Sequence, residues 1–250
     1  MIRACAVIPY FEHPRTLGVT VEALRRHGLG CWVVDDGSTS ASHAVAQRLA
    51  EREPDAVRLL THGANRGKGA AVLSGCRAAA AAGFTHVLQI DADGQHDADD
   101  IPLLLSRATQ HPHALILGTP RFDASIPRAR RYGRHVTHLW VRINTLSLDV
   151  ADSMCGFRVY PLTPLLELAD AELLGHRMEF DIEVVVRLHW RGLPVIEVPT
   201  RVLYPRDGVS HFRLWRDNLL ISGMHARLFL GMLRRFPGLL ARRLRETRHA

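Results

Sequence analysis

The sequence predicts an α/β fold, in which helices cover both faces of a mostly parallel β-sheet. Short apolar runs bounded by polar residues alternate with longer segments of helical period along the chain. These units recur at spacings of roughly 25 to 30 residues, which is typical of βαβ units and a parallel sheet. Right-handed crossovers then place helices on both faces. A chain of 250 residues can bury a sizeable core, so we expect one main domain.

The first half of the chain alternates regularly between predicted strands and helices. The hydroxyl groups of residues 38–40 are suited to cap the helix that follows them. Gly83 ends an alanine-rich helix, as glycine often does. The predicted strands are residues 4–8, 31–34, 57–60, 87–90 and 114–117. The predicted helices are residues 15–27, 40–52, 70–82 and 99–110.

The second half departs from this regular alternation. An arginine-rich segment follows Gly118, with Arg121, Arg128, Arg130, Arg131 and Arg134. Beyond it we expect a helix at 136–148, a strand ending near 161, a helix from 179 to 190 and a strand at 194–203. A loop at 204–211 leads to a basic amphipathic helix that runs from 212 to about 245.

The composition is that of an ordinary folded protein, with 47% hydrophobic and 23% charged residues. Its formal net charge of +7 makes nucleic acid, anionic lipid and phosphorylated ligands the classes of partner to consider. The four cysteines have no C-x-x-C spacing, and we interpret them as reduced packing residues in a cytosolic compartment. We expect no signal peptide. The sequence contains no uninterrupted apolar run of about eighteen residues, so we expect no membrane-spanning helix.

Residues 86–97 are the most informative stretch, because an apolar strand ends there in two carboxylates one residue apart. Open α/β sheets bind their ligands at the carboxyl ends of the strands. Mg²⁺ prefers oxygen donors, and Asp91, Asp93 and the amide oxygen of Gln95 supply such a set. The alternative is an ordinary polar loop, since Asp and Gly are common in turns. The loops after the first, second and fourth strands all carry polar groups, so we expect them to meet at one edge.

Six short motifs occur in order along residues 4–211. They are Val7-Ile-Pro9, Val34-Asp-Asp-Gly-Ser-Thr39, Asn65-Arg-Gly-Lys-Gly-Ala70, Asp91-Ala-Asp-Gly-Gln-His96, Cys155-Gly-Phe-Arg158 and Glu179-Phe-Asp181. In this order they resemble glycosyltransferase family 2, particularly its dolichyl-phosphate and polyprenyl-phosphate sugar synthases. The resemblance implies a GT-A fold over 1–211, a nucleotide-sugar donor, a divalent metal ion and inversion at the anomeric carbon. The missing G-x-G-x-x-G turn argues against an NAD enzyme.

The resemblance also implies roles for individual residues. The nucleoside would be held by Pro9, Phe11 and Asp36, through main chain, ring stacking and a base hydrogen bond. Asp91 would lie by the ribose or the metal ion, while Asp93 and Gln95 would bind the metal ion. Contacts to the base or the diphosphate fall on Arg66 and Lys68. The candidate phosphate clamps are Arg121, Arg131 and Arg206, for which the alternative is a solvated surface charge.

Two features of the resemblance leave alternatives open. The family's first loop usually continues with Tyr-Asn, whereas this chain has Phe11-Glu12. Phe11 can stack on a base but offers no hydroxyl group for a hydrogen bond, and Glu12 adds a negative charge. Inverting transfer uses a carboxylate to take the proton of the acceptor, and Asp152 and Asp181 are the candidates. A phosphate acceptor is already ionised and needs no such base.

The tail at 212–250 is a separate matter, because it lies outside the resemblance. Its apolar residues are interspersed with arginines, which predicts a helix that lies on an anionic membrane surface. The alternative is a helix packed on the body with a solvated basic face. Nucleic acid ranks last, since aromatic residues are few and no recognition motif is present.

Together these observations predict an inverting, metal-dependent glycosyltransferase. It would use Mg²⁺ or Mn²⁺ and a UDP- or GDP-sugar, with a lipid acceptor that is most simply a polyprenyl phosphate. We expect it in the cytoplasm, peripherally on the inner face of the membrane. The alternatives are a catalytically silent module that binds a nucleotide sugar or a lipid, and a sugar nucleotidyltransferase.

Overall fold

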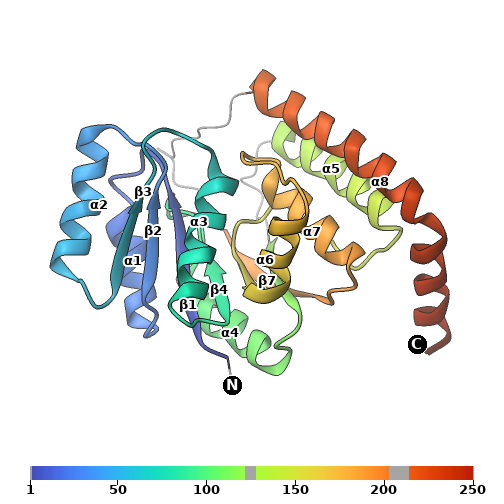
Figure 1. Ribbon diagram of the computed structural model, residues 1–250, viewed down its shortest axis with the longest axis horizontal. Helices are drawn as coiled ribbons and strands as arrows, with labels where there is room; N and C mark the ends of the chain where they lie inside the picture. The colour runs from blue at the N-terminus through green and yellow to red at the C-terminus, as the bar shows by residue number, and fades with distance from the viewer. Residues whose placement is uncertain (1, 122–127, 203–213, 250) are drawn as a thin grey trace.

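A computed structural model of the chain describes residues 2–121, 128–202 and 214–249, with backbone alone at 128–132, 214 and 246–249. Its seven-stranded sheet has the order β3-β2-β1-β4-β6-β5-β7 (Figure 1). Strand β6 runs antiparallel to both of its neighbours, and the other pairs are parallel. The strands are β1 (Ala4–Tyr10), β2 (Cys31–Asp35), β3 (Val57–Thr61), β4 (His86–Gln89), β5 (Leu115–Arg121), β6 (Arg158–Pro161) and β7 (Val195–Arg201). The predicted mostly parallel sheet is confirmed.

The helices follow the predicted alternation with two differences. Helix α5 begins earlier than the predicted residue 136, because its arginine-rich first turns are themselves good helix formers. Helix α6 was not predicted, since it follows β6 without a polar loop to mark a boundary. The helices are α1 (Leu17–Arg26), α2 (Ser40–Arg52), α3 (Lys68–Ala81), the 3₁₀ turn η1 (Ala98–Asp100), α4 (Ile101–Gln110), α5 (Arg128–Thr145), α6 (Leu162–Ala171), α7 (Phe180–Trp190) and α8 (Leu214–His249).

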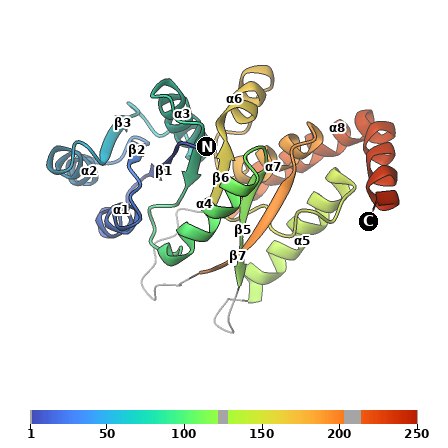
Figure 2. The same cartoon turned by 90° about the horizontal axis from the view of Figure 1, so that it is seen from below.

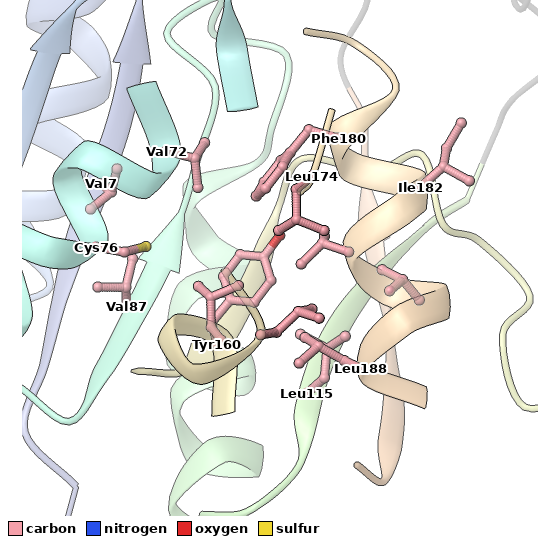
Figure 3. Packing of buried hydrophobic residues seen from close by; sticks show 14 of the residues in the cluster. Val7, Val72, Cys76, Val87, Leu115, Tyr160, Leu174, Phe180, Ile182 and Leu188 are labelled. Carbon is pink, nitrogen blue, oxygen red and sulfur yellow. The ribbon is translucent and has the colours of Figure 1, made fainter. Parts of the chain in front are cut away.

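Helices cover both faces of the sheet and form two apolar cores. Successive residues of β1 alternate between them: Val7 packs with residues of α3, α6 and α7, while Ile8 packs with residues of α1, α2 and α4. Figure 3 shows the first core, where Phe180 of α7 and Val72 of α3 lie over the strands. All four cysteines are buried as free thiols, as expected of packing residues.

Helix α8 lies beside α5 at one end of the molecule, in both views (Figures 1 and 2). One side of it belongs to the first core, since Met224 and Leu228 are fully buried there. Farther along, the guanidinium group of Arg242 donates to the carbonyl oxygen of His189 at 2.9 Å. The tail therefore packs on the body, and its other side is exposed. No helix in the described part of the chain is long and apolar enough to cross a bilayer.

Candidate active site

The loops that follow β1, β2 and β4 meet at the carboxyl edge of the sheet, as the sequence predicted. Glu12, after β1, accepts hydrogen bonds from the backbone amide of Thr39 and, at 2.7 Å, from the hydroxyl group of Ser42. The hydroxyl group of Thr16 donates to the carbonyl oxygen of Ala92, which follows β4. These contacts join three segments that are distant in sequence.

Lys68 occupies the centre of the charged site at this edge. Its ammonium nitrogen lies 2.8 and 2.9 Å from the two carboxylate oxygens of Asp91 and 2.7 Å from Oδ2 of Asp181. Lys68 is the first residue of α3, Asp91 follows β4, and Asp181 lies in the first turn of α7. Three of the residues predicted for the site are thus joined through one cation.

The pKa values of Lys68 and Asp91 are shifted chiefly by the charged groups that these two side chains contact. Burial alone would lower the pKa of Lys68, but the two carboxylates more than offset it and raise that pKa above its ordinary value. Burial alone would likewise raise the pKa of Asp91, yet Lys68 and then His96 hold it below its ordinary range. Lys68 is therefore a charged ammonium and Asp91 a carboxylate at neutral pH.

Two further groups confine the carboxylate of Asp91. The Nε2 atom of His96 lies 3.7 Å from Oδ2, and its ring stacks on Phe157 with 5.1 Å between ring centroids. Gly156 lies so close that a Cβ atom there would be 2.5 Å from Oδ2 of Asp91. The Cys155-Gly-Phe-Arg158 motif therefore shapes the space around Asp91.

Three buried polar residues to which the sequence analysis gave no individual role, Gln89, Tyr160 and Arg158, support Asp181. The side-chain amide of Gln89 donates to Oδ1 of Asp181 at 3.1 Å, and the hydroxyl group of Tyr160 donates to Gln89 at 3.2 Å. The fully buried Arg158 donates to the backbone oxygen of Asp181 at 2.8 Å. The sequence offered one signal of this network: Gln89 is a polar residue inside the otherwise apolar run 87–90, where a buried side chain needs a hydrogen-bond partner.

Asp152, the other candidate base, has a separate set of partners. Its Oδ1 atom accepts the backbone amides of Met154 and Cys155 at 2.8 and 3.1 Å. Its Oδ2 atom accepts from Nε of Arg134 at 3.0 Å, with His138 at 3.6 Å. Both oxygens are engaged, so Asp152 organises the turn that carries Gly156.

Asp36 braces the loop that leads into α3. It accepts the backbone amides of Arg66 and Gly67 at 2.9 and 2.7 Å, and its Oδ1 atom lies 2.7 Å from Nδ1 of His62. Gly67 has φ of 106°, a conformation that favours glycine, and the carbonyl oxygen of His176 leaves no space for a Cβ atom. A nucleobase N–H that donates to Asp36, as the sequence predicted, would have to share these oxygens.

Glu12 has a structural explanation that the sequence did not reveal. It supplies a carboxylate to the amino-terminal end of α2, whose own first turn contains no acidic residue. A negative charge at this end of a helix is favourable. The neighbouring Pro9 and Phe11 are half-buried at the same edge of the sheet.

Asp93 and Gln95 lie in the half-buried loop after β4, where the backbone amide of Gln95 donates to Oδ1 of Asp93 at 3.0 Å. Within the described side chains, no three acidic, histidine or cysteine residues gather as a ready metal cage. The donor set still fits Mg²⁺ or Mn²⁺, because such ions take a few carboxylate or amide oxygens together with phosphate oxygens and water.

The predicted cationic contacts are less fully placed. Arg66 is exposed, and Arg121 is exposed at the end of β5, where it pairs in register with Arg201 of β7. Arg206 and the side chain of Arg131 lie outside the described residues. The roles of all four remain predictions.

Comparison with known proteins identifies the family. The profile of Glycosyl transferase family 2 matches residues 5–164, well over half of the chain. The chain belongs to this family. It is 30% identical to the polyprenol monophosphomannose synthase of Mycolicibacterium smegmatis, over 83% of this chain and 80% of the relative. It is 27% identical to the undecaprenyl-phosphate mannosyltransferase of Micrococcus luteus, over 79% and 82%.

Solved structures agree with this family 2 glycosyltransferase in fold. Glucosyl-3-phosphoglycerate synthase from Mycobacterium tuberculosis, in complex with Mn²⁺, UDP and glucosyl-3-phosphoglycerate, superposes with a TM-score of 0.66 at 18% identity. That match covers 93% of this chain and 78% of the other. A mannosyltransferase from Pyrobaculum calidifontis, in complex with GDP-Man and Mn²⁺, gives 0.60 at 17% identity over 96% and 73%. The predicted GT-A fold is confirmed.

Proposed function

We propose that this glycosyltransferase transfers a sugar, with inversion, from a nucleoside diphosphate to a polyprenyl phosphate, with the help of Mg²⁺ or Mn²⁺. Three relatives are named as a polyprenol monophosphomannose synthase, an undecaprenyl-phosphate mannosyltransferase and a dolichyl-phosphate N-acetylglucosaminyltransferase that uses UDP-N-acetylglucosamine. Fold neighbours contain Mn²⁺ together with UDP or GDP-mannose. Family membership favours sugar transfer over nucleotidyl transfer.

Asp91, Asp93 and Gln95 would hold the metal ion, since all three follow β4 at the ligand-binding edge of the sheet. The metal ion supplies positive charge for the diphosphate that leaves the sugar. Phe11 would stack on the base beside Pro9, and Arg66 would approach the base or the diphosphate. Arg121, Arg131 and Arg206 would contact phosphate groups.

The proposal of a phosphate acceptor rests on one observation: both candidate catalytic bases, Asp152 and Asp181, are already bound by other groups of the protein. Asp181 is bound by Lys68 and Gln89, and each oxygen of Asp152 has a protein partner. A hydroxyl acceptor needs a base to take its proton, whereas an ionised phosphate does not. These engaged carboxylates favour an acceptor that carries its own negative charge, and Asp152 and Asp181 then serve to position groups around the reaction.

The exposed side of α8 supports a lipid acceptor. A stripe of apolar residues, separated by about one, two or three whole helical turns, runs along this side, opposite the buried Met224 and Leu228. We call it the outer stripe: Trp215, Leu219, Leu230, Leu233, Leu240 and Leu244. Helical spacing places a row of arginines along one flank of it: Arg216, Arg227, Arg234 and Arg245. Of these, Arg227 also lies 3.6 Å from the carboxylate of Glu183 and is 56% exposed.

An apolar stripe beside a row of cations fits the surface of an anionic bilayer, with the helix axis in the plane of the membrane. The apolar side chains would enter the acyl boundary and the arginines would meet the lipid phosphates. This arrangement would bring the catalytic domain to a lipid-linked acceptor on the cytoplasmic leaflet.

The decisive experiment is a donor screen with the full chain. The protein is incubated with polyprenyl phosphate, Mg²⁺ or Mn²⁺ and a panel of UDP- and GDP-sugars, and the glycolipid is isolated. We expect one donor to be consumed only when metal and lipid are present, and NMR of the product to show the inverted anomeric configuration. A folded protein that turns over no donor overturns the proposal, and donor binding by calorimetry without turnover would identify a silent binding module.

A further inference from the structure

Lys68 is shared between two carboxylates that belong to different parts of the site. Asp91 follows β4 next to the predicted metal donors, whereas Asp181 comes from α7. The ammonium group lies within 2.9 Å of an oxygen atom of each, and the side chain is only 16% exposed. Partial burial strengthens such contacts, because less water competes for the charges than at an open surface.

The same carboxylate cannot give its full charge to Lys68 and to a metal ion at once. Both oxygens of Asp91 lie at hydrogen-bonding distance from the ammonium nitrogen. A divalent cation that binds Asp91 must therefore take over at least part of this contact. Asp181, which is held from behind by Gln89 and Arg158, stays in place as a second partner for the ammonium group.

We propose that Lys68 is an internal counter-ion that a divalent cation displaces from Asp91, and that Asp181 is the positioning residue that keeps the displaced ammonium group. The inference rests on the proposed metal-dependent function, because it assumes that Asp91 faces the metal ion. It assigns Asp181 a role in metal affinity although Asp181 is not a metal ligand.

The two residues should then change Mn²⁺ affinity in opposite directions. Lys68→Met removes the competing cation, so Mn²⁺ should bind more tightly, on the order of tenfold. Asp181→Asn leaves Asp91 as the remaining carboxylate for Lys68, so Mn²⁺ should bind more weakly, again by about tenfold. Lys68→Arg keeps the charge and should stay nearer to wild type than the Met variant.

The test is a double-mutant cycle read by Mn²⁺ binding, with free Mn²⁺ measured by electron paramagnetic resonance in the absence of donor. In the Lys68→Met background, Asp181→Asn should lose most of its effect, because the residue through which it acts is gone. The double variant removes a cation and an anion together, so it remains informative if Lys68→Met alone does not fold. Arg77→Met, on the same helix but paired with Asp170 at 2.6 Å, controls for net charge and should leave Mn²⁺ affinity unchanged.

An unchanged or weaker Mn²⁺ affinity in folded Lys68→Met would overturn the inference. The inference would also be overturned if Asp181→Asn weakened Mn²⁺ binding equally with and without Lys68. It would be overturned as well if neither the wild-type protein nor the Lys68→Met variant bound Mn²⁺. Donor turnover by the wild type, measured in parallel, separates this inference from the proposed function. If the wild type turns over donor but the variants have unchanged Mn²⁺ affinity, the proposed function stands and the role of Lys68 as counter-ion is overturned. If the Mn²⁺ affinities change as expected but no donor is turned over, the role of Lys68 stands and the proposed function is overturned.

Discussion

Gly156 lies directly against the carboxylate of Asp91, with no space for a side chain between them. A Cβ atom at position 156 would be 2.5 Å from Oδ2 and 2.8 Å from Oδ1 of Asp91. The carboxylate has little freedom to retreat, because Lys68 and His96 hold it from other directions. The backbone at Gly156, in the motif Cys155-Gly-Phe-Arg158, thus limits where the carboxylate of Asp91 can lie.

Gly156→Ala should therefore impair catalysis more than folding. The added methyl group would displace the carboxylate of Asp91 from its present position. A displacement of about 1 Å at a reacting site costs on the order of a hundredfold in rate. We expect a fall of this size in kcat/KM for donor turnover. Gly18→Ala is the matched control, since nothing lies within 4 Å of its Cβ position. Equal activity in the two variants would contradict the steric role of Gly156.

Asp93→Asn should remove metal-dependent activity and leave the fold intact. The substitution keeps the size and one carbonyl oxygen but deletes the charge that holds a hard cation, so we expect a loss of roughly a hundredfold or more in kcat. Asp97→Asn, in the same loop, changes a residue that caps η1 and should keep its activity. Full activity in Asp93→Asn would place the metal ion elsewhere. Asp91→Asn should be milder if that residue contacts the ribose, and the comparison separates the two roles.

Asp152→Asn should lower stability without shifting the pH profile of the reaction. The carboxylate is buried and bound by Arg134 and two backbone amides, and breaking such a pair costs about 3 kcal/mol or more in the free energy of unfolding. Denaturant unfolding measures this loss, with the more exposed Asp149→Asn as the control. If stability were unchanged and the acidic limb of the pH–rate profile disappeared, Asp152 would be the catalytic base after all.

The outer stripe of α8 should bind anionic vesicles. The double substitution Leu230→Asp and Leu233→Asp places two charges on exposed positions, so we expect vesicle co-sedimentation to fall at least about tenfold with little change in melting temperature. Leu173→Asp introduces a charge at a 94% exposed leucine outside the stripe and should bind vesicles normally. Unchanged co-sedimentation of the double variant would refute the membrane role, and loss of a dimer on gel filtration would assign the stripe to a second copy of the chain. Deleting α8 is a poorer test, because Met224 and Leu228 belong to the core.

Stability should fall in weak acid because of His225 of α8, which is buried against α5. Burial lowers its pKa from 6.5 to about 4. Above pH 6.5 the imidazole is neutral in the folded and unfolded states, so it contributes no pH dependence. As the pH falls from 6.5 to 4, the unfolded chain binds a proton that the folded protein does not, and the free energy of unfolding drops by up to about 3 kcal/mol. His225→Leu should flatten this slope in melting curves taken across that range, and an unaltered slope would contradict the assignment.

Local patterns in the sequence were sufficient for the fold class, for most of the helices and strands, and for part of the site. The run at 87–90 is short, apolar and followed by acids, which identifies a buried strand and its ligand-binding end without knowledge of the neighbours. Family membership was predicted from the resemblance of six ordered motifs to a known family, and it is confirmed. The convergence of three loops at one edge was predicted from the polar residues that follow the strands, and it is confirmed as well. Helix α6 escaped prediction because its boundary with β6 has no polar signal.

By itself the sequence determined the alternation of strands and helices, because burial period and loop composition are local properties of the chain. It also determined which acids stand at the ends of strands. Only the tertiary structure decided that Lys68 bridges Asp91 and Asp181, because the three residues come from separate elements that meet across the sheet edge. The same holds for the two faces of α8: the sequence shows an amphipathic basic helix, but which apolar residues are covered depends on where α5 and α7 pack against it. Contacts between distant segments depend on the packing of the whole chain, and spacing along the chain cannot specify them.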